Sequence, residues 1–523
     1  MSSTIPSHWV ESEQVDALGA TLRLYTSSKT KLRVVFIDSE GPLVNCYFTL
    51  STEAQTNSYA HKDDGLPHTL EHLVFLGSEK YPYKGVLDKL ANRCLAQGTN
   101  AWTDTDHTAY TVTTAGSEGF VNLLPIYADH IFFPTMTDDG YITEIHHITG
   151  EGEDKGVVYC EMQGRENSAG SLIDGKCMDL LYPEEGCGLA SETGGKMHEI
   201  RTSLNNEKIR QYHREYYRPD NACLIITGIV DAGEVLNALG EFEQKYLEKN
   251  AANPYPKMER PWSTPVSPLT GSASATIRFP SEDESTGTVS VCWRAARFTA
   301  ENKFVESLAR KILWNYLSDS AASPLQVAFV ENEDAIAADL GHVSDVHETG
   351  YDQLWFSSCP VDRLEEIVPM LEKELLKICD KGFDMSLIKT EIKRYRRKYK
   401  KSMENDPADQ LLWPTIKHFL YSARDEKSSI ETDTLKKYVG VLDQLDIIEN
   451  EKFTTSDDWV QLLRSAFVDA HKMYVIGLPS AEMAKNMAAD EKKRTEDQAK
   501  RLGAEKLKEV SRADMDTVED YSQ

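Results

Sequence analysis

The chain has 523 residues, with 57 basic and 84 acidic side chains and a formal net charge of −27. This acidity excludes general nucleic-acid binding, because phosphate contacts require an excess of lysine and arginine. A hydrophobic content of 40% with 9% aromatic residues excludes disorder over most of the chain. At about 100–200 residues per domain, the length allows about two to four domains.

The cysteines and the first residues indicate the compartment. Nine cysteines are scattered without a Cys-x-x-Cys pair, which is typical of reduced thiols rather than of a disulfide framework. Residues 1–10 lack the cationic and apolar regions of a secretory signal. The most apolar stretch, residues 222–230, is far shorter than the about 20 residues that cross a bilayer. We therefore expect a soluble, cytoplasmic protein without membrane contact.

The first part of the chain alternates strand and turn signals. β-Branched and aromatic runs predict strands at residues 20–25, 31–37, 43–50 and 108–114. A helix is expected to start near Pro67, which is tolerated in a first turn, and to run to Gly77. An amphipathic helix from about residue 117 to 130 follows the last of these strands.

A helix–strand–glycine–helix pattern occurs twice in the sequence. The first copy has its helix at residues 208–217 and its strand at 222–226, and the second has them at 459–467 and 473–476. Units of this kind, about 250 residues apart, indicate two copies of one α+β domain. The alternative is that two unrelated α/β segments share this simple pattern.

Composition sets the expected domain boundaries. Residues 250–272 contain five prolines together with serine and threonine, which is typical of a linker. Near the end of the chain, charged residues and alanine dominate, so a solvated helix is expected there. We predict an N-terminal domain at residues 1–255, a linker at 256–272, a second, homologous domain at 273–482 and a charged helical tail or connector at 483–523.

His68, Glu71 and His72 form the motif that carries chemistry. On the predicted helix the histidines are i and i+4, so both imidazoles project from one face, as two ligands of one tetrahedral Zn²⁺ require. Glu71 lies on the same face, where it can take a proton from a zinc-bound water. The motif therefore predicts a hydrolytic zinc site.

A hydrolytic zinc site needs a third protein ligand and leaves the fourth position to water. The spacing alone does not choose this ligand, because it comes from elsewhere in the fold. The candidates downstream of the motif are Glu144, His146, His147, Glu151, Glu153, Asp154, Glu161 and Glu166.

Further segments follow the inverted His-x-x-Glu-His motif in a recognisable order. They are a Gly-Ser-x-x-Tyr-Pro-Tyr-Lys-Gly run at residues 77–85, Asn-Ala-Trp-Thr at 100–103, Thr-Asp-His-Thr-Ala-Tyr at 105–110 and Gly-Val-Val-Tyr-Cys-Glu-Met at 156–162. With these segments the chain resembles the pitrilysin/insulysin family of zinc metallopeptidases, and within it the N-terminal half of the presequence-protease-like branch. The likeness has specific motifs over residues 20–260 and only a general pattern over 270–500.

The resemblance implies roles for further residues. It makes Glu161 the third zinc ligand, although Cys160 stands where the family has an asparagine. Asp154, seven residues before Glu161, becomes the candidate supporting acid. The family also has a substrate-binding edge strand, whose backbone pairs with the peptide and so tolerates many sequences. Its residues in this chain are Asn100, Ala101 and Trp102.

The resemblance further implies a fold and an activity. The fold is α+β, with two homologous α/β-sandwich domains that each have a mostly antiparallel sheet flanked by helices, as half of a clamshell metallopeptidase. The activity is hydrolysis of peptides or small unfolded proteins in a closed chamber, with one Zn²⁺ per chain and Glu71 as the general base on a zinc-bound water.

Single-chain family members contain two such halves, so a C-terminal half or a second subunit is the expected partner. The alternative function is a catalytically weak or inactive half that binds peptide or assembles with a second half-subunit. The family also includes mitochondrial enzymes, although the sequence shows no transit peptide.

Overall fold

Two β-sheets organise the chain, which this computed structural model describes over residues 3–54, 63–184, 187–255, 260–262, 265–297, 303–422 and 434–520. The first sheet has seven strands in the order β1-β2-β3-β9-β4-β6-β5. Its strands are β1 (Trp9–Ala17), β2 (Ala20–Ser27), β3 (Arg33–Asp38), β4 (Leu43–Ser51), β5 (Asn100–Thr103), β6 (His107–Ala115) and β9 (Ala222–Thr227). Neighbouring strands run antiparallel except β3 and β9, which are parallel. Every residue of β9 is buried, as expected for a central strand that is covered on both faces.

The second sheet has five strands in the order β10-β14-β11-β13-β12. These are β10 (Ala273–Pro280), β11 (Thr286–Arg297), β12 (Asp339–Asp345), β13 (Thr349–Pro360) and β14 (Lys472–Ser480). Only β10 and β14 pair in parallel. A separate two-stranded hairpin is formed by β7 (His147–Ile148) and β8 (Asp154–Lys155).

The two sheets share one topology. The order β3-β9-β4-β6-β5 corresponds strand for strand to β10-β14-β11-β13-β12, with the parallel pair at the same place in both. In each sheet the last strand in sequence lies inside the sheet: β9 lies between β3 and β4, and β14 lies between β10 and β11. The predicted fold class, two α/β domains with mostly antiparallel sheets flanked by helices, is therefore confirmed.

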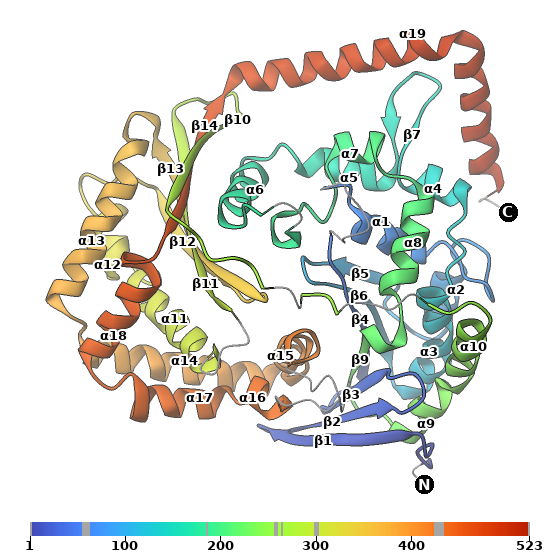
Figure 1. The fold of residues 1–523 in the computed structure, drawn as a ribbon, viewed down its shortest axis with the longest axis horizontal. Helices are drawn as coiled ribbons and strands as arrows, with labels where there is room; N and C mark the ends of the chain where they lie inside the picture. Colours follow the sequence, from blue (N-terminus) through green and yellow to red (C-terminus); the bar gives the residue numbers. More distant parts are fainter. Residues whose placement is uncertain are drawn as a thin grey trace.

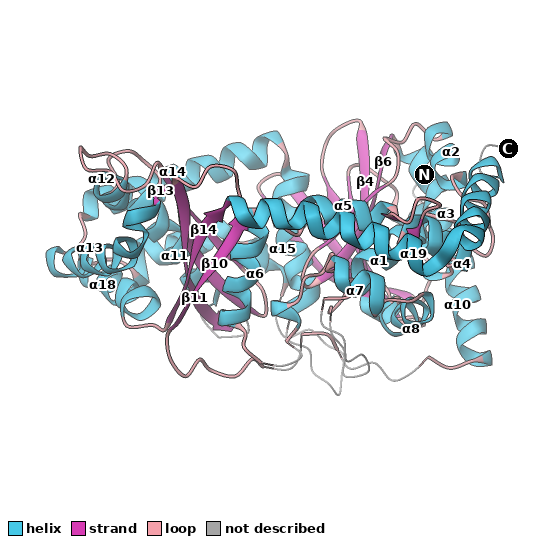
Figure 2. Ribbon diagram, turned by 90° about the horizontal axis from the view of Figure 1, so that it is seen from above, coloured by secondary structure: helices cyan, strands magenta, loops and turns pink. Residues whose placement is uncertain are grey.

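Helices cover both sheets, as Figures 1 and 2 show. Those of the first part are α1 (Leu66–Val74), α2 (Val86–Arg93), α3 (Ser117–Phe132), α4 (Asp138–Glu144), α5 (Val157–Arg165), α6 (Ala169–Leu181), α7 (Met197–Thr202), α8 (Asn206–Tyr216), α9 (Ala232–Ala238) and α10 (Gly240–Ala252). Those of the second part are α11 (Lys303–Ser318), α12 (Pro324–Phe329), α13 (Ile367–Lys381), α14 (Met385–Asn405), α15 (Pro407–Tyr421), α16 (Leu435–Val439), α17 (Val441–Ile447), α18 (Ser456–Leu463) and α19 (Ala481–Asp520). Short 3-10 and π turns are η1 (Gly188–Ala190), η2 (Pro219–Asn221), η3 (Val361–Glu366), η4 (Ile448–Lys452) and η5 (Arg464–Val468). Among the described helices, none combines the length and apolar character needed to cross a bilayer.

A shared hydrophobic core joins the two sheets. One face of the first sheet packs on α1, α3 and α8. Residues of its other face, such as Leu22 and Ile225, belong to a cluster that also contains Ile173 of α6, Ile416 of α15 and Val475 of β14. The two domains are therefore packed together through apolar side chains, with α6 and α15 between the sheets (Figure 1).

Most predicted elements of the first part are present. The predicted strands lie in β2, β3, β4 and β6, and the helix predicted at residues 117–130 lies in α3. The helix that contains Pro67 ends at Val74 rather than at Gly77, and β1 was not predicted, because its charged residues hide the strand pattern. The domain boundaries remain predictions, and part of the expected linker, residues 256–259 and 263–264, lies outside the described residues.

Candidate active site

α1 carries the histidine–glutamate motif. The helix begins after Gly65, which adopts φ 74°, and Pro67 occupies its first turn. His68 and Glu71 are only 7% and 9% exposed, and His72 is half-buried. The two imidazole rings are perpendicular, with centroids 4.9 Å apart. The predicted i, i+4 arrangement of the histidines is therefore present on one face of the helix.

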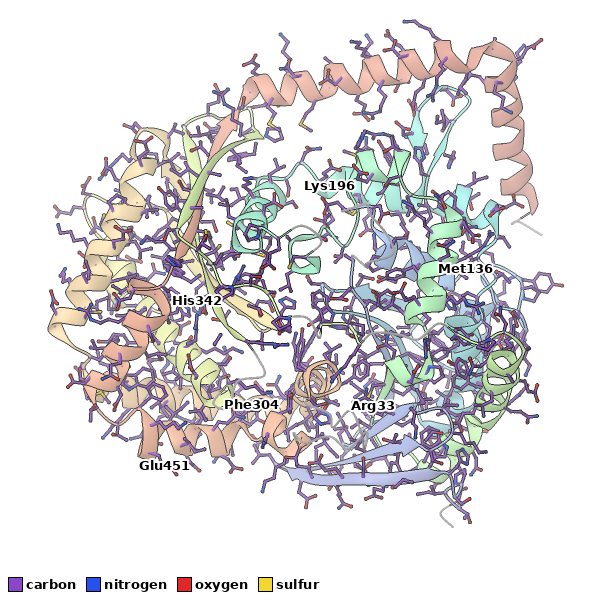
Figure 3. All side chains as sticks on the ribbon, in the orientation of Figure 1. Arg33, Met136, Lys196, Phe304, His342 and Glu451 are labelled. Atoms are coloured by element: carbon purple, nitrogen blue, oxygen red, sulfur yellow. The ribbon has the colours of Figure 1, made fainter. Side chains whose placement is uncertain are left out.

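A loop lies directly against the start of α1. The Nδ1 atom of His68 donates a hydrogen bond to the carbonyl oxygen of Gly194 over 3.2 Å. A Cβ atom on Gly65 would lie 2.7 Å from that oxygen, so the close approach requires glycine. Lys196, labelled in Figure 3, holds the loop by pairing with Asp63 at 2.7 Å. The loop thereby orients His68 so that Nε2 faces the site.

Glu161 of α5 completes the donor set. Its Oε2 atom lies 3.5 Å from Nε2 of His68 and 3.7 Å from Nε2 of His72. Ligand atoms at the corners of a tetrahedron with bonds of about 2.0–2.1 Å are about 3.4 Å apart. The two nitrogens and the carboxylate oxygen therefore fit a single Zn²⁺ in composition and spacing.

Glu144, at the end of α4, is the carboxylate that bonds a histidine of the motif. Nδ1 of His72 donates to its Oε1 atom over 3.1 Å, and Nζ of Lys84 lies 3.5 Å from Oε2. Burial alone would raise the pKa of Glu144, but His72 and Lys84 hold the pKa below its ordinary value. A carboxylate at the outer nitrogen fixes the tautomer and orientation of a metal-ligating histidine. Sequence reasoning placed Glu144 only among the candidate ligands.

Glu71 and His68 have the protonation preferences that the chemistry needs. Burial raises the pKa of Glu71, partly offset by the hydroxyl of Thr103, which donates to Oε2 over 2.5 Å. A carboxylate with a raised pKa is a better proton acceptor near neutral pH. Burial and the neighbouring His72 lower the pKa of His68, which favours the neutral imidazole that a metal requires.

Asp154 does not bond the motif histidines in the described contacts. Its Oδ1 atom pairs with Nε2 of His146 at 2.8 Å, and its Oδ2 atom accepts from Nε of Arg494 in α19, also at 2.8 Å. Burial would raise the pKa of Asp154, but these two partners lower it. The geometry that a supporting acid needs is therefore found at Glu144, and Asp154 links β8 to the C-terminal helix.

The segment with Asn100, Ala101 and Trp102 is the edge strand β5. It pairs with β6 on one side and ends the sheet on the other, so its outer backbone edge has no strand partner among the described residues. The side chain of Asn100 is exposed. Since Thr103 of this strand bonds Glu71, the open edge runs directly beside the candidate general base.

Trp102 connects this edge strand to the second domain. Its Nε1 atom donates to Nε2 of His107 over 2.9 Å, and Nδ1 of His107 pairs with Asp106 at 2.6 Å. Nζ of Lys417 in α15 lies 3.1 Å from the other oxygen of Asp106, and the ring of Trp413 lies 5.8 Å from that of Trp102. The sequence could not reveal this network, because its two groups, at residues 102–107 and 413–417, lie more than 300 residues apart.

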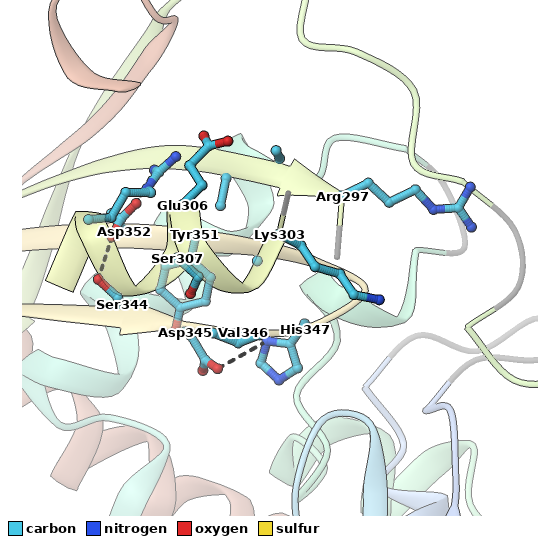
Figure 4. A pocket seen from close by; sticks show the side chains of 14 residues that line it. Arg297, Lys303, Glu306, Ser307, Ser344, Asp345, Val346, His347, Tyr351 and Asp352 are labelled. Atoms are coloured by element: carbon cyan, nitrogen blue, oxygen red, sulfur yellow. Dashed lines mark hydrogen bonds and ion pairs between the residues drawn. The ribbon is translucent and has the colours of Figure 1, made fainter. Parts of the chain in front are cut away.

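A second group of potential ligand atoms belongs to the same network. Oxygens of Asp104 and Asp106 and a nitrogen of His347 lie within 4.8 Å of one another. His347 also pairs with Asp345 at 3.5 Å, at the pocket shown in Figure 4. Because the ammonium group of Lys417 already balances Asp106, this group is a polar contact between the domains.

Comparison with protein families identifies two matches in the chain. Residues 56–154, which include the motif, match the family described as Insulinase (Peptidase family M16). Residues 203–395, which contain no motif residue, match the family described as Peptidase M16 inactive domain.

Among similar sequences, an uncharacterised protein of Caenorhabditis elegans is 36% identical over 97% of this chain and 48% of its own length. Presequence protease 1, chloroplastic/mitochondrial, of Arabidopsis thaliana is 33% identical over 39% of this chain and 19% of its own length. The chain thus spans about half the length of the first relatives that it matches.

Solved structures show the same fold at low sequence identity. A protease from Helicobacter pylori superposes with a TM-score of 0.65 at 16% identity, covering 89% of this chain and 99% of that one. The first half of the periplasmic protease PqqL from Escherichia coli gives a TM-score of 0.63 at 16% identity, covering 95% and 98% of the two chains.

Proposed function

Because the chain belongs to peptidase family M16, as a pitrilysin-like and presequence-protease-like member, we propose that it is a zinc-dependent endopeptidase that hydrolyses peptides or small unfolded proteins. The observation that carries the proposal is the convergence of His68, His72 and Glu161 within 4.8 Å, with Glu71 beside them. These three residues would hold the metal.

The roles of the side chains follow from their positions. Zn²⁺, when bound, supplies a Lewis acid that lowers the pKa of water and polarises the scissile carbonyl. Glu71 accepts the proton of the attacking water and delivers it to the leaving nitrogen as the C–N bond breaks. Thr103 holds the Glu71 carboxylate for this transfer.

β5 supports the proposal with a place for the substrate. An extended peptide that pairs with the open edge of β5 adds a strand to the first sheet, and recognition then rests on the peptide backbone. Such a peptide passes beside Glu71, because Thr103 belongs to the same strand. Asn100, Ala101 and Trp102 are the residues proposed to contact it.

The length of the chain suggests a partner. Since the chain spans about half of its first relatives, we propose that a C-terminal half or a second subunit completes the chamber. A catalytically weak half that binds peptide remains the second candidate. The match of residues 203–395 to an inactive domain favours this candidate, although those residues contain no part of the motif.

Two variants test the proposal. We expect Glu71→Gln to keep stoichiometric zinc and to lose cleavage of a quenched fluorescent peptide, and His68→Ala to lose both. Glu118→Gln, at an exposed position of α3, serves as the matched control and should keep both properties. Zinc is measured by mass spectrometry, and peptide cleavage is measured with and without an added C-terminal half. Undiminished cleavage by Glu71→Gln would refute the assignment, whereas zinc without cleavage in every mixture would favour the peptide-binding half.

A further inference from the structure

Glu161 is the most exposed of the three potential ligands. Its side chain is 41% exposed, against 9% for His68 and 19% for His72. Its helix, α5, buries only Val158, Tyr159 and Met162. These three side chains anchor one face of the helix in the core of the first domain, and the position of its other face depends on contacts from other segments.

The C-terminal helix α19 lies against the hairpin that leads into α5. Arg494 donates to the carboxylate of Asp154 in β8 over 2.8 Å, and Nε2 of Gln498 donates to the carbonyl oxygen of Gly152 over 2.9 Å. A Cβ atom on Gly152, which has φ 85°, would lie 3.0 Å from the Cβ atom of Ala499. The helix and the hairpin turn are thus in direct contact.

α19 also contacts α5 itself. Gln163 donates to the carboxylate of Glu491 over 2.6 Å, and Arg494 lies 3.5 Å from the hydroxyl of Tyr159. Glu161 stands between Tyr159 and Gln163 in the sequence. The contacts of α19 therefore bracket the potential zinc ligand.

The other end of α19 is fixed to the second domain. The helix continues directly from β14, and the backbone N–H of Ala481 donates to the carboxylate of Glu284 over 3.0 Å. From residue 481 to 494 the helix rises about 20 Å, at about 1.5 Å per residue. Figures 1 and 2 both show it crossing from β14 to the region of β7 and α5.

α6, which follows α5 in the chain, is also held by the second domain. Asp174 accepts a hydrogen bond from Gln353 of β13 over 2.7 Å. Ile173 also lies close to Gly477 of β14: a Cβ atom on Gly477 would be 2.6 Å from the Cδ1 atom of Ile173. Both the segment before α5 and the segment after it are therefore attached to parts of the second domain.

We propose that the second domain positions Glu161 through α19 and α6, with Arg494 and Asp154 as positioning residues for the third zinc ligand. This proposal rests on the proposed function. Asp154 has a side chain only 2% exposed, so its charge depends on its two partners, His146 and the guanidinium group of Arg494. The domain without the motif thereby contributes to metal affinity, although it supplies no ligand.

The first test measures zinc affinity by competition with a chromophoric chelator. We expect Arg494→Met in the full chain to weaken zinc binding about tenfold. This is the low end of the loss of about 10–100-fold in metal affinity that is typical when groups orienting the metal ligands are mutated. Arg494→Lys, which keeps the charge, should retain most of the affinity. Lys493→Met removes the same charge from an exposed neighbouring position and should change nothing. Equal affinity of Arg494→Met and Lys493→Met would overturn the proposal.

The second test needs no metal. Hydrogen exchange of the metal-free proteins should be faster at the α5 amides of Arg494→Met than in the unchanged chain, and equal at α1. Gln498→Leu, which removes the bond to Gly152, should show the same pattern and replaces Arg494→Met if that variant folds poorly. Unchanged exchange at α5 would overturn the positioning role. Absence of zinc binding by the unchanged chain would instead refute the proposed function.

Discussion

The ion pair between Lys417 and Asp106 offers the sharpest test of how the two domains are held together. Asp106 is fully buried, the side chain of Lys417 is 17% exposed, and their charged atoms are 3.1 Å apart. At an effective dielectric constant of about 20, the Coulomb attraction at this distance is about 5 kcal/mol. The hydroxyl of Tyr421 and Nδ1 of His107 also donate to Asp106.

Lys417→Met removes one partner and leaves the buried carboxylate uncompensated. Breaking such pairs reduces the free energy of unfolding by about 3–5 kcal/mol. Because Tyr421 and His107 still donate hydrogen bonds to Asp106, we expect a loss at the lower end of this range, about 3 kcal/mol. The double variant Lys417→Met with Asp106→Asn removes both charges of the pair, so we expect a loss of only about 1 kcal/mol.

Urea unfolding at neutral pH, followed by tryptophan fluorescence and by circular dichroism, measures these values if the two transitions coincide. A loss below about 1 kcal/mol in Lys417→Met, or a double variant less stable than the single one, would refute the reasoning.

The same pair predicts a pH dependence. Burial alone would raise the pKa of Asp106, but Lys417 and His107 hold it well below its ordinary value. Its contribution is therefore complete above about pH 4, the unfolded value, and is lost as the pH falls through the folded pKa. Burial alone would lower the pKa of Lys417, but Asp106 and Asp345 raise it, so its contribution is lost only as the pH rises through a pKa above about 10.4. Neither group of the pair therefore titrates between about pH 5 and 9. Burial would lower the pKa of His347, but Asp345, Asp104 and Asp106 raise it, so the difference in stability between the chain and the double variant should change in this range only as His347 titrates.

Three further outcomes are expected. Glu144→Gln should weaken zinc binding about 10–100-fold in chelator competition, because the bond to His72 is weakened; unchanged affinity would argue against this role. Burial lowers the pKa of His213 to about 4. As the pH falls, this histidine is therefore protonated in the unfolded chain before it is protonated in the folded chain, and the free energy of unfolding should fall by about 3 kcal/mol between about pH 6.5 and 4. His213→Asn should flatten that part of the urea-midpoint curve, and an equal slope would contradict the assignment. Gly65→Ala should lower the free energy of unfolding by about 1–3 kcal/mol and weaken zinc binding, because the new Cβ atom displaces the Gly194 carbonyl; an unchanged urea midpoint would contradict this.

The sequence revealed what depends on local spacing. His68, Glu71 and His72 are neighbours on one helix, so their common face follows from helical geometry alone. The strands of the first sheet were visible for a similar reason, because alternating or apolar runs are local signals. Glu161 was found only by resemblance, since its approach to α1 depends on how α5 packs.

The partners that orient the site could not be predicted. Glu144 bonds a residue 72 positions away, and Gly194 bonds one 126 positions away. The composition of the tail, in which charged residues and alanine dominate, predicts a solvated helix. Its contact with the first domain uses Arg494 and Gln498, polar side chains whose pairing depends on tertiary structure rather than on any sequence period.

The shared strand order of the two sheets has a consequence for synthesis of the chain. β9 and β14 each lie inside their sheet, yet each is the last strand of that sheet to leave the ribosome. The strand that pairs with both β3 and β4 is complete only after residues 222–227 have been synthesised. The strand that pairs with both β10 and β11 is complete only after residues 472–480 have been synthesised. Such long-range pairing slows folding and leaves strand edges open in the nascent chain. Each domain is therefore closed by its final strand, and a nascent chain stalled before residue 472 presents two unpaired strand edges to chaperones.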